Sequence, residues 1–282
     1  MKKDSEDWDN GTNDAFYNYL GQTGALEEFA KQAGLNTCCD FETMQAIGWL
    51  PSEKKRSAHV LEVGGGLGRG LGWLLSNQFT RVSTIEKSAV FCDILQKKFN
   101  AHPDRLAINI INDNVKSLER HCSEKFTRIF WLWCGICDFS KKEHIDLLQL
   151  LMSFLQEENG LLIVDVPLEE TNATSQSGNV HVIDKIEGMS VPTYHGYVPS
   201  DDEMYTYAKI LKVKTMPQLF VTETKRKRQL WAFWHYTRKE IPITPNLRLD
   251  IFRNTYQQYL KNKERSEASA AASDDTSVKI FG

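Results

Sequence analysis

The stretch that decides the fold is Glu62-Val63-Gly64-Gly65-Gly66-Leu67-Gly68, between the apolar run 59–63 and the helix-like run 70–75. Glycines at alternate positions leave the backbone N–H groups of a strand-to-helix loop open to a ligand. Dinucleotide-binding loops have the spacing G-x-G-x-x-G, but here positions 64 and 66 lead to Arg69, and positions 66 and 68 lead to Leu71. The loop therefore predicts a nucleotide-like ligand and disfavours a dinucleotide.

Apolar runs alternate with helix-like runs on both sides of this loop. The expected strands are 59–63, 82–85, 107–111, 129–133 and 160–164, and the expected helices between them are 70–75, 89–99, 115–121 and 142–156. Five apolar strands separated by helices require a parallel sheet that is covered on both faces. Two last strands, 218–223 and 229–234, flank the basic turn Lys225–Arg228 and are typical of an antiparallel hairpin. The fold class predicted is α/β, a doubly wound, mostly parallel seven-stranded sheet with a C-terminal antiparallel hairpin strand.

Four segments are expected along the chain. Residues 1–56 form an N-terminal helical extension or lid, 57–240 the ligand-binding core, 241–263 a C-terminal helical segment, and 264–282 a small, polar and disordered tail. Within the core, a loop from about 167 to 198 contains the strand-like piece 180–183 and is long enough to be functional.

The glycine spacing, with Glu86 after the second strand and Asp113 after the third, resembles that of the class I S-adenosylmethionine (SAM)-dependent methyltransferases. The resemblance covers residues 57–234, and the terminal hairpin is a second match to that family. It implies that the glycine loop packs against the amino acid and ribose parts of SAM, the next acid binds the ribose hydroxyls, and the third position faces the adenine amine. The cofactor-binding residues implied by position are Glu62, Gly64, Gly66 and Gly68, then Glu86, and then Asp113 with Asn114.

These roles agree with the chemistry of the side chains, since a carboxylate can accept two hydrogen bonds from a vicinal diol. Alternatives remain open at two positions. Glu86 is otherwise a solvated acid at a strand end, and residues 111–114 are otherwise a turn with a helix cap. Trp133 ends the fourth strand, near the active edge of the sheet, and is a candidate for contact with cofactor or substrate.

The acceptor of the methyl group is marked less clearly. Residues 133–139 have neither the Asn/Asp-Pro-Pro-Tyr/Phe tetrad of nucleic-acid N-methyltransferases nor the double-glutamate loop of arginine methyltransferases. The catalytic candidates are Asp138 and Asp165, which either orient a substrate amine or cap local structure, and Tyr194 and His195 in the long loop. A neutral imidazole is a suitable general base near pH 7, and a tyrosine can bind a substrate group.

Two other features are weaker. The N-terminal aromatic residues Trp8, Phe16, Tyr17 and Tyr19 form either a lid over the cofactor or an ordinary packed helix face. Cys134-x-x-Cys137 has no second pair at ligand spacing, so no metal site is expected.

Composition narrows the class of protein and of partner. The formal net charge of −3 provides no overall basic field, so nucleic acid is an unlikely partner and a small molecule or a protein is the expected substrate. With no run of eighteen apolar residues and no export signal, we expect a cytoplasmic protein without a membrane span. The function predicted is methyl transfer from SAM to an N or O nucleophile. Aminopropyl transfer, as in spermidine synthases, and a non-catalytic scaffold of the same fold are the alternatives.

Overall fold

A computed structural model of the chain describes residues 13–27, 39–46, 48–51, 55–102, 108–167, 180–186, 189–223 and 228–237. The chain divides into two compact units, residues 1–244 and 245–282, and every described residue belongs to the first. The expected C-terminal helical segment 241–263, the expected tail 264–282 and the turn residues 225–227 lie outside the described residues. The segment boundaries therefore stay predictions.

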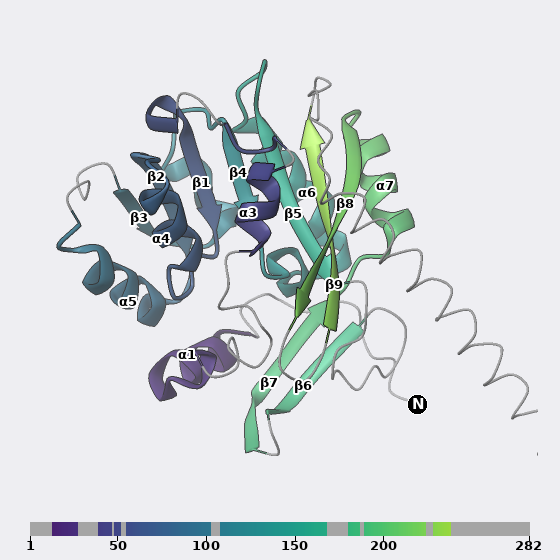
Figure 1. Cartoon of the computed structure of the whole chain (residues 1–282). Coiled ribbons are helices and arrows are strands. Elements are labelled where there is room, and N and C mark those ends of the chain that lie inside the picture. Colours follow the sequence, from purple (N-terminus) through teal and green to yellow (C-terminus); the bar gives the residue numbers. More distant parts are fainter. Residues whose placement is uncertain are drawn as a thin grey trace, which may run out of the picture. The chain divides into compact units, whose positions relative to one another are not determined.

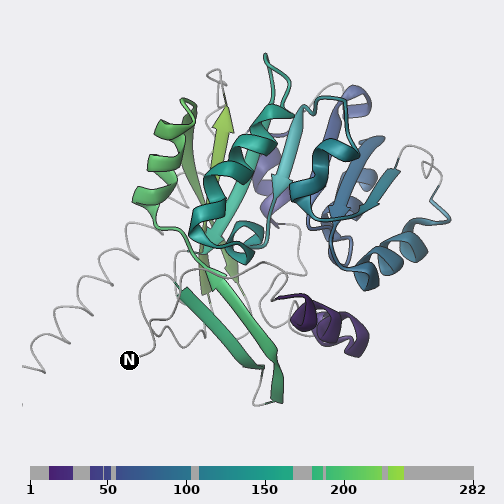
Figure 2. The same ribbon diagram turned by 180° about the vertical axis from the view of Figure 1, so that it is seen from behind.

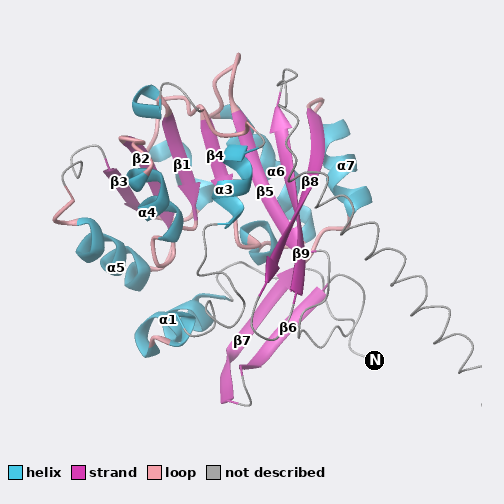
Figure 3. Cartoon of the chain, viewed as in Figure 1, coloured by secondary structure: helices cyan, strands magenta, loops and turns pink. Residues whose placement is uncertain are grey.

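A seven-stranded sheet forms the centre of the first unit (Figure 3). Its order is β3-β2-β1-β4-β5-β9-β8. The bounds are β1 His59–Val63, β2 Arg81–Glu86, β3 Ile108–Asn112, β4 Arg128–Trp131, β5 Leu161–Pro167, β8 Lys214–Glu223 and β9 Arg228–Thr237. β1 to β5 pair in parallel, and β9 runs antiparallel to β5 and β8. The predicted fold class is confirmed.

Helices cover both faces of the sheet, as the apolar strands require (Figures 1 and 2). On one face lie α3 (Cys39–Ala46), α4 (Arg69–Ser76) and α5 (Ala89–Phe99); on the other lie α6 (Lys141–Ser153), α7 (Asp201–Ile210) and the 3₁₀ helix η4 (Val115–Arg120). Alternate strand residues serve the two faces: Leu61, Val63 and Trp131 belong to the core under α6, whereas Phe130 packs on Phe41 of α3. The structure also describes helix α1 (Asp14–Thr23) and the 3₁₀ turns η2 (Lys55–Ser57) and η5 (Gly135–Asp138).

Capping residues set where several helices begin. Ser140 and Glu143 form a capping box at the start of α6, and Ser200 and Glu203 form another at the start of α7. Ser88 accepts a hydrogen bond from the N–H of Phe91 and so caps α5. The cap at Ser88 thereby fixes the turn that follows β2.

The prediction of a long loop over residues 167–198 is wrong for the second part of that range. Residues Val180–Ile186 (β6) and Met189–Tyr197 (β7) form an antiparallel hairpin, a separate two-stranded sheet of which only 180–183 had a strand pattern (Figure 3). The terminal strands are also longer than expected, since β8 begins at Lys214 rather than 218. Pro217 argues against a strand because it has no N–H to donate, but β8 is the edge of the sheet and tolerates it.

None of the helices in the described ranges combines the length and the apolar character needed to cross a membrane.

Candidate functional site

The glycine loop between β1 and α4 has two kinds of glycine. Gly64, Gly66 and Gly68 all have positive φ (76°, 50° and 74°), which other residues adopt at a cost. A Cβ placed on Gly64 or Gly66 would meet no atom within 4 Å, whereas one on Gly68 would lie 2.7 Å from Leu95 and 2.7 Å from Phe99. The first two glycines therefore border open space, and the third allows close packing of the loop on α5.

Glu86, the last residue of β2, holds this loop in place. Its Oε2 accepts a hydrogen bond from the N–H of Gly66 at 2.9 Å, and its Oε1 accepts one from the N–H of Ser88 at 2.8 Å. Burial raises the pKa of Glu86, and these two N–H donors oppose the rise. The side chain is thus a buried, oriented carboxyl beside the open face of the loop rather than a solvated acid.

Glu62, at the start of the loop, is a buried carboxyl with an unused oxygen. The residue is 7 % exposed, and its Oε2 has no hydrogen-bond partner. Burial raises the pKa of Glu62 to about 8, although nearby Arg69 opposes this. An unsatisfied buried oxygen is costly, so the site is prepared for a donor that the protein itself does not supply.

Arg69 forms the wall next to Glu62. Its guanidinium makes two hydrogen bonds of 2.5 Å to the carboxylate of Asp40 on α3. It also lies 4.9 Å from the ring centroid of Trp133 and 5.4 Å from that of Phe41. A paired, stacked arginine is rigid, and it joins α3, α4 and the end of β4 around the loop.

Asp113 and Asn114 follow β3, one strand farther along the edge. Asp113 is 32 % exposed and accepts a 2.7 Å hydrogen bond from His121, which lowers its pKa, and another from the N–H of Asn114. The Asn114 side chain accepts from the N–H of Lys116 and caps η4. Both side chains are engaged in local turn and cap contacts, so their role toward a cofactor stays a prediction.

Asp165, on β5, is also engaged by backbone. It is 1 % exposed, and its two oxygens accept from the N–H groups of Trp133 (3.0 Å) and Cys134 (2.8 Å). Both of those residues have positive φ, 61° and 57°, a conformation that side chains disfavour. Burial raises the pKa of Asp165 to about 7 against these two donors. The geometry favours the structural alternative: Asp165 holds the strained turn that positions Trp133.

Asp138, the last residue of η5, lies in a different setting. The Tyr17 hydroxyl donates to both of its oxygens, at 2.7 Å and 2.9 Å, and the Tyr194 hydroxyl donates to Oδ1 at 2.7 Å. All three side chains are half-buried. Burial raises the pKa of Asp138 to about 6, and the two hydroxyls moderate the rise. These contacts bring α1, η5 and β7 together at one carboxyl group.

Tyr194 and His195 are neighbours on β7, so their side chains lie on opposite faces of the strand. Tyr194 is the one that contacts Asp138. The backbone of His195 is held by Asn13, whose side chain accepts from its N–H at 2.9 Å and donates to its carbonyl at 2.8 Å. The catalytic role predicted for His195 remains untested, and the alternation favours Tyr194.

Sequence reasoning missed several residues of this arrangement. Asn13, Asp40 and Arg69 carried no recognisable motif, because each acts through a contact distant in sequence. Tyr17 was open as lid or packing residue; its ring packs with Phe16, and its hydroxyl reaches Asp138. Only the aromatic run 16–19 gave a signal.

A metal role for Cys134 and Cys137 finds no support in the described part of the chain. Both thiols are free, and no group of three His, Cys, Asp or Glu side chains there is placed to hold a metal ion.

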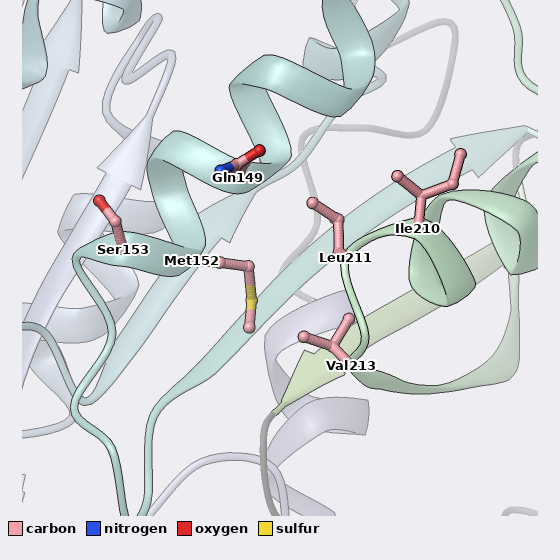
Figure 4. A pocket seen from close by; sticks show the side chains of 6 residues that line it. All are labelled: Gln149, Met152, Ser153, Ile210, Leu211 and Val213. Atoms are coloured by element: carbon pink, nitrogen blue, oxygen red, sulfur yellow. The ribbon is translucent and has the colours of Figure 1, made fainter.

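A separate pocket lies between the end of α6 and the turn from α7 to β8 (Figure 4). Its lining residues are Gln149, Met152, Ser153, Ile210, Leu211 and Val213. α6 ends where β5 is about to begin, so this pocket is at the amino ends of the strands. Ligands of open α/β sheets bind at the carboxyl ends, where the glycine loop and Glu86 lie.

No family model matches the chain, and no curated protein matches its sequence. Solved structures do match. The CcbJ methyltransferase from Streptomyces caelestis is 15 % identical with a TM-score of 0.51, over 83 % of this chain and all of that one. The glycopeptide N-methyltransferase MtfA is 13 % identical with a TM-score of 0.55, over 73 % and 90 %.

A third structure, magnesium protoporphyrin IX methyltransferase (ChlM) from Synechocystis PCC 6803 with bound SAM, is 12 % identical with a TM-score of 0.54, over 83 % of this chain and 99 % of that one. At identities this low, a structural match shows the fold alone and does not show the reaction. On that basis the chain has the fold of the class I SAM-dependent methyltransferases.

Proposed function

We propose that this protein is a SAM-dependent methyltransferase that acts on an N or O nucleophile of a small molecule or a protein side chain. One observation carries the proposal: Gly64 and Gly66 border open space in a loop that begins at the buried carboxyl Glu62 and is held by the buried carboxyl Glu86. The solved structures of the same fold that carry methyltransferase names support the same class.

The residues present fit SAM as the cofactor. The unpartnered Oε2 of Glu62 is suited to the ammonium of the amino acid part, which is the cationic hydrogen-bond donor of that ligand. Glu86 is oriented by two N–H groups and keeps acceptor capacity for the ribose hydroxyls, because a carboxylate has about four lone-pair sites. The open space at Gly64 and Gly66 admits the chain between these two ends.

SAM, when bound, supplies an electrophilic methyl group on a sulfonium. The task left to the protein is to align a nucleophile and to accept its proton. Trp133 and Asp138 follow β4, which neighbours β1 in the sheet, so both lie at the edge where the acceptor must enter. Tyr194, from the β6–β7 hairpin, completes this side through Asp138.

The proposal is tested by calorimetry with SAM and with its demethylated product, S-adenosylhomocysteine. We expect both to bind at micromolar concentration, as ligands that share the adenosine and amino acid contacts. Failure of both to bind at millimolar concentration would sink the methyltransferase proposal and leave a scaffold of the same fold.

Transfer itself is tested with methyl-labelled SAM and fractionated cell extract. A labelled product from wild-type protein that is absent from Glu86→Ala supports methyl transfer. Release of 5′-methylthioadenosine, rather than decarboxylated S-adenosylhomocysteine, when decarboxylated SAM is supplied would identify aminopropyl transfer instead.

A further inference from the structure

The group formed by Asp138, Tyr17 and Tyr194 goes beyond what the fold requires. The carboxyl of Asp165 accepts from the backbone N–H groups of Trp133 and Cys134. Asp138 instead accepts from two side-chain hydroxyls, one on α1 and one on β7, and all three residues keep part of their surface exposed. Such a group can exchange a partner without unfolding a turn.

We propose that Asp138, with Tyr17 and Tyr194, binds the methyl acceptor as an ammonium ion and takes its proton, so that the substrate class is a primary or secondary amine. This inference rests on the proposed methyltransferase function and specifies the acceptor of that same site. It assigns Tyr17, on the N-terminal helix, a place in the acceptor site.

The surroundings of Asp138 suit a cation. The rings of Phe16, Tyr17 and Tyr194 form one cluster, with centroids 5.2 Å apart for Phe16 and Tyr194 and 6.2 Å for Tyr17 and Tyr194. Aromatic faces beside a carboxylate attract an ammonium ion by two mechanisms, ion pairing and cation–π interaction. An alcohol would gain neither of them.

Proton transfer also favours an amine over an alcohol. A simple ammonium ion has a pKa near 10, and its transfer from water into a buried site lowers that pKa. An aliphatic hydroxyl has a far higher pKa. Burial raises the pKa of Asp138 to about 6, which reduces the difference between its pKa and that of an ammonium ion. The hydroxyls of Tyr17 and Tyr194 retain their own protons, because burial raises the pKa of each well above 10.

The step balances with no further reactant. The ammonium gives its proton to the Asp138 carboxylate, the amine lone pair forms the N–C bond, and the S–C bond breaks with its electrons left on sulfur. The product is an N-methylammonium, and Asp138 then passes its proton to water.

Other charges near Asp138 set the pH at which it works. Those that influence its titration or that of its two tyrosine partners are Glu86 and Lys87, at and just after the end of β2, Cys134 just before η5, and Cys137 on η5. Lys87 forms an ion pair of 2.7 Å with Asp14 on α1. Glu86 raises the pKa of Asp138 and Lys87 lowers it. Ionised Asp138 is required, so activity should rise with pH through about 6 and then level off.

The test uses full-length protein loaded with S-adenosylhomocysteine and three probes, namely benzylamine, benzyl alcohol and p-cresol. Calorimetry at pH 7 should show benzylamine binding at least tenfold more tightly than either hydroxyl probe. Asp138→Asn should remove that preference, and the exposed Asp146→Asn should keep it. Equal binding of amine and alcohol, or no binding of the amine to protein that binds S-adenosylhomocysteine, overturns the inference. Loss of S-adenosylhomocysteine binding itself would instead count against the proposed function.

The rate at which the labelled product forms from the cell extract provides the second readout. The product should be an N-methylamine, formed about a hundredfold more slowly by Asp138→Asn. Tyr194→Phe keeps the ring and removes one hydroxyl from the carboxylate, so the pH at which activity rises should move upward. If thermal unfolding shows that Asp138→Asn does not fold, the Tyr194→Phe profile decides. An O-methyl product, or a profile that Tyr194→Phe leaves unmoved, refutes the amine assignment.

Discussion

The two sides of the candidate site are built differently. On the cofactor side, residues 62–68 and 86–88 lie within one β–α–β unit, and Glu86 contacts the backbone of Gly66 and Ser88. On the acceptor side, Asp138 meets Tyr17 across 121 positions and Tyr194 across 56, through side chains. Backbone contacts within one unit do not depend on side-chain identity and suit a ligand that many proteins of the fold share. Side chains from three separate elements can each be substituted without altering the others. In the proposed function, the first side binds a cofactor and the second side selects the substrate.

Loss of Glu86 should have the largest effect, and that effect should fall mainly on the cofactor side. Glu86→Ala removes the acceptor of two charge-assisted hydrogen bonds to the ribose, each worth about 1.5–3 kcal/mol, so SAM should bind roughly a thousandfold more weakly. Calorimetry measures the change, with exposed Glu119→Ala as the matched control. Unchanged affinity in a folded Glu86→Ala protein means that the ribose assignment is wrong.

The next effect tests whether Asp165 is structural. Asp165→Ala leaves the N–H groups of Trp133 and Cys134 buried without an acceptor, at about 1–3 kcal/mol each. The free energy of unfolding in urea should fall by roughly 3 kcal/mol, while Asp146→Ala stays within ~0.5 kcal/mol. A stable Asp165→Ala protein with normal SAM affinity and no turnover would instead make Asp165 catalytic.

A pair of glycine variants should divide the loop into its two functions. Gly68→Ala places a Cβ 2.7 Å from Leu95 and Phe99 at positive φ, so stability should fall by about 2 kcal/mol. Gly66→Ala meets no protein atom and should lower stability by only about 1 kcal/mol, yet it fills space needed by the ligand. Urea unfolding and SAM titration of both proteins make the comparison. If Gly66→Ala and Gly68→Ala show the same ratio of lost stability to lost SAM affinity, the two glycines do not have separate roles.

The smallest effect concerns protons on the cofactor side. Because burial raises the pKa of Glu62 to about 8, its carboxyl carries a proton at pH 6 to 7 without ligand. An ammonium placed beside it favours the ionised form, so SAM binding should release a proton, and affinity should rise less than tenfold per unit between pH 6 and 7.5. Calorimetry in two buffers of different ionisation enthalpy counts the protons. Glu62→Gln should abolish the release, and the same buffer dependence in that variant would exclude Glu62 as its source.

The glycine loop and Glu86 could be singled out from the sequence because their signals are local, and their role toward the cofactor stays a prediction. The alternate glycines, the strand before them and Glu86 twenty positions after Gly66 lie in one unit of regular geometry. Asp113 and Asn114 were less decidable, since the same residues serve a turn and a cap, and the structure shows these contacts. The parallel strands and the antiparallel terminal hairpin were predicted from hydrophobic patterning, whereas the order of the strands in the sheet came from the structure.

The acceptor side resisted prediction for a physical reason. Asn13 reaches His195 across 182 positions, and nothing in either neighbourhood marks the pair. The β6–β7 hairpin was only partly recognised because its strands mix polar and apolar residues, as in 184–186. Asp138 and Tyr194 were chosen as candidates, but their contact became visible only when the chain was folded.

Helix α1 connects the two sides. Its Asp14 pairs with Lys87, and its Asn18 accepts from Ser88 beside Glu86, while Tyr17 reaches Asp138. A ligand on either side that strengthens these contacts holds α1 in the position that the other side also uses. We therefore expect cofactor and acceptor to bind with positive cooperativity. By linkage, the product that dissociates first then lowers the affinity of the protein for the other product.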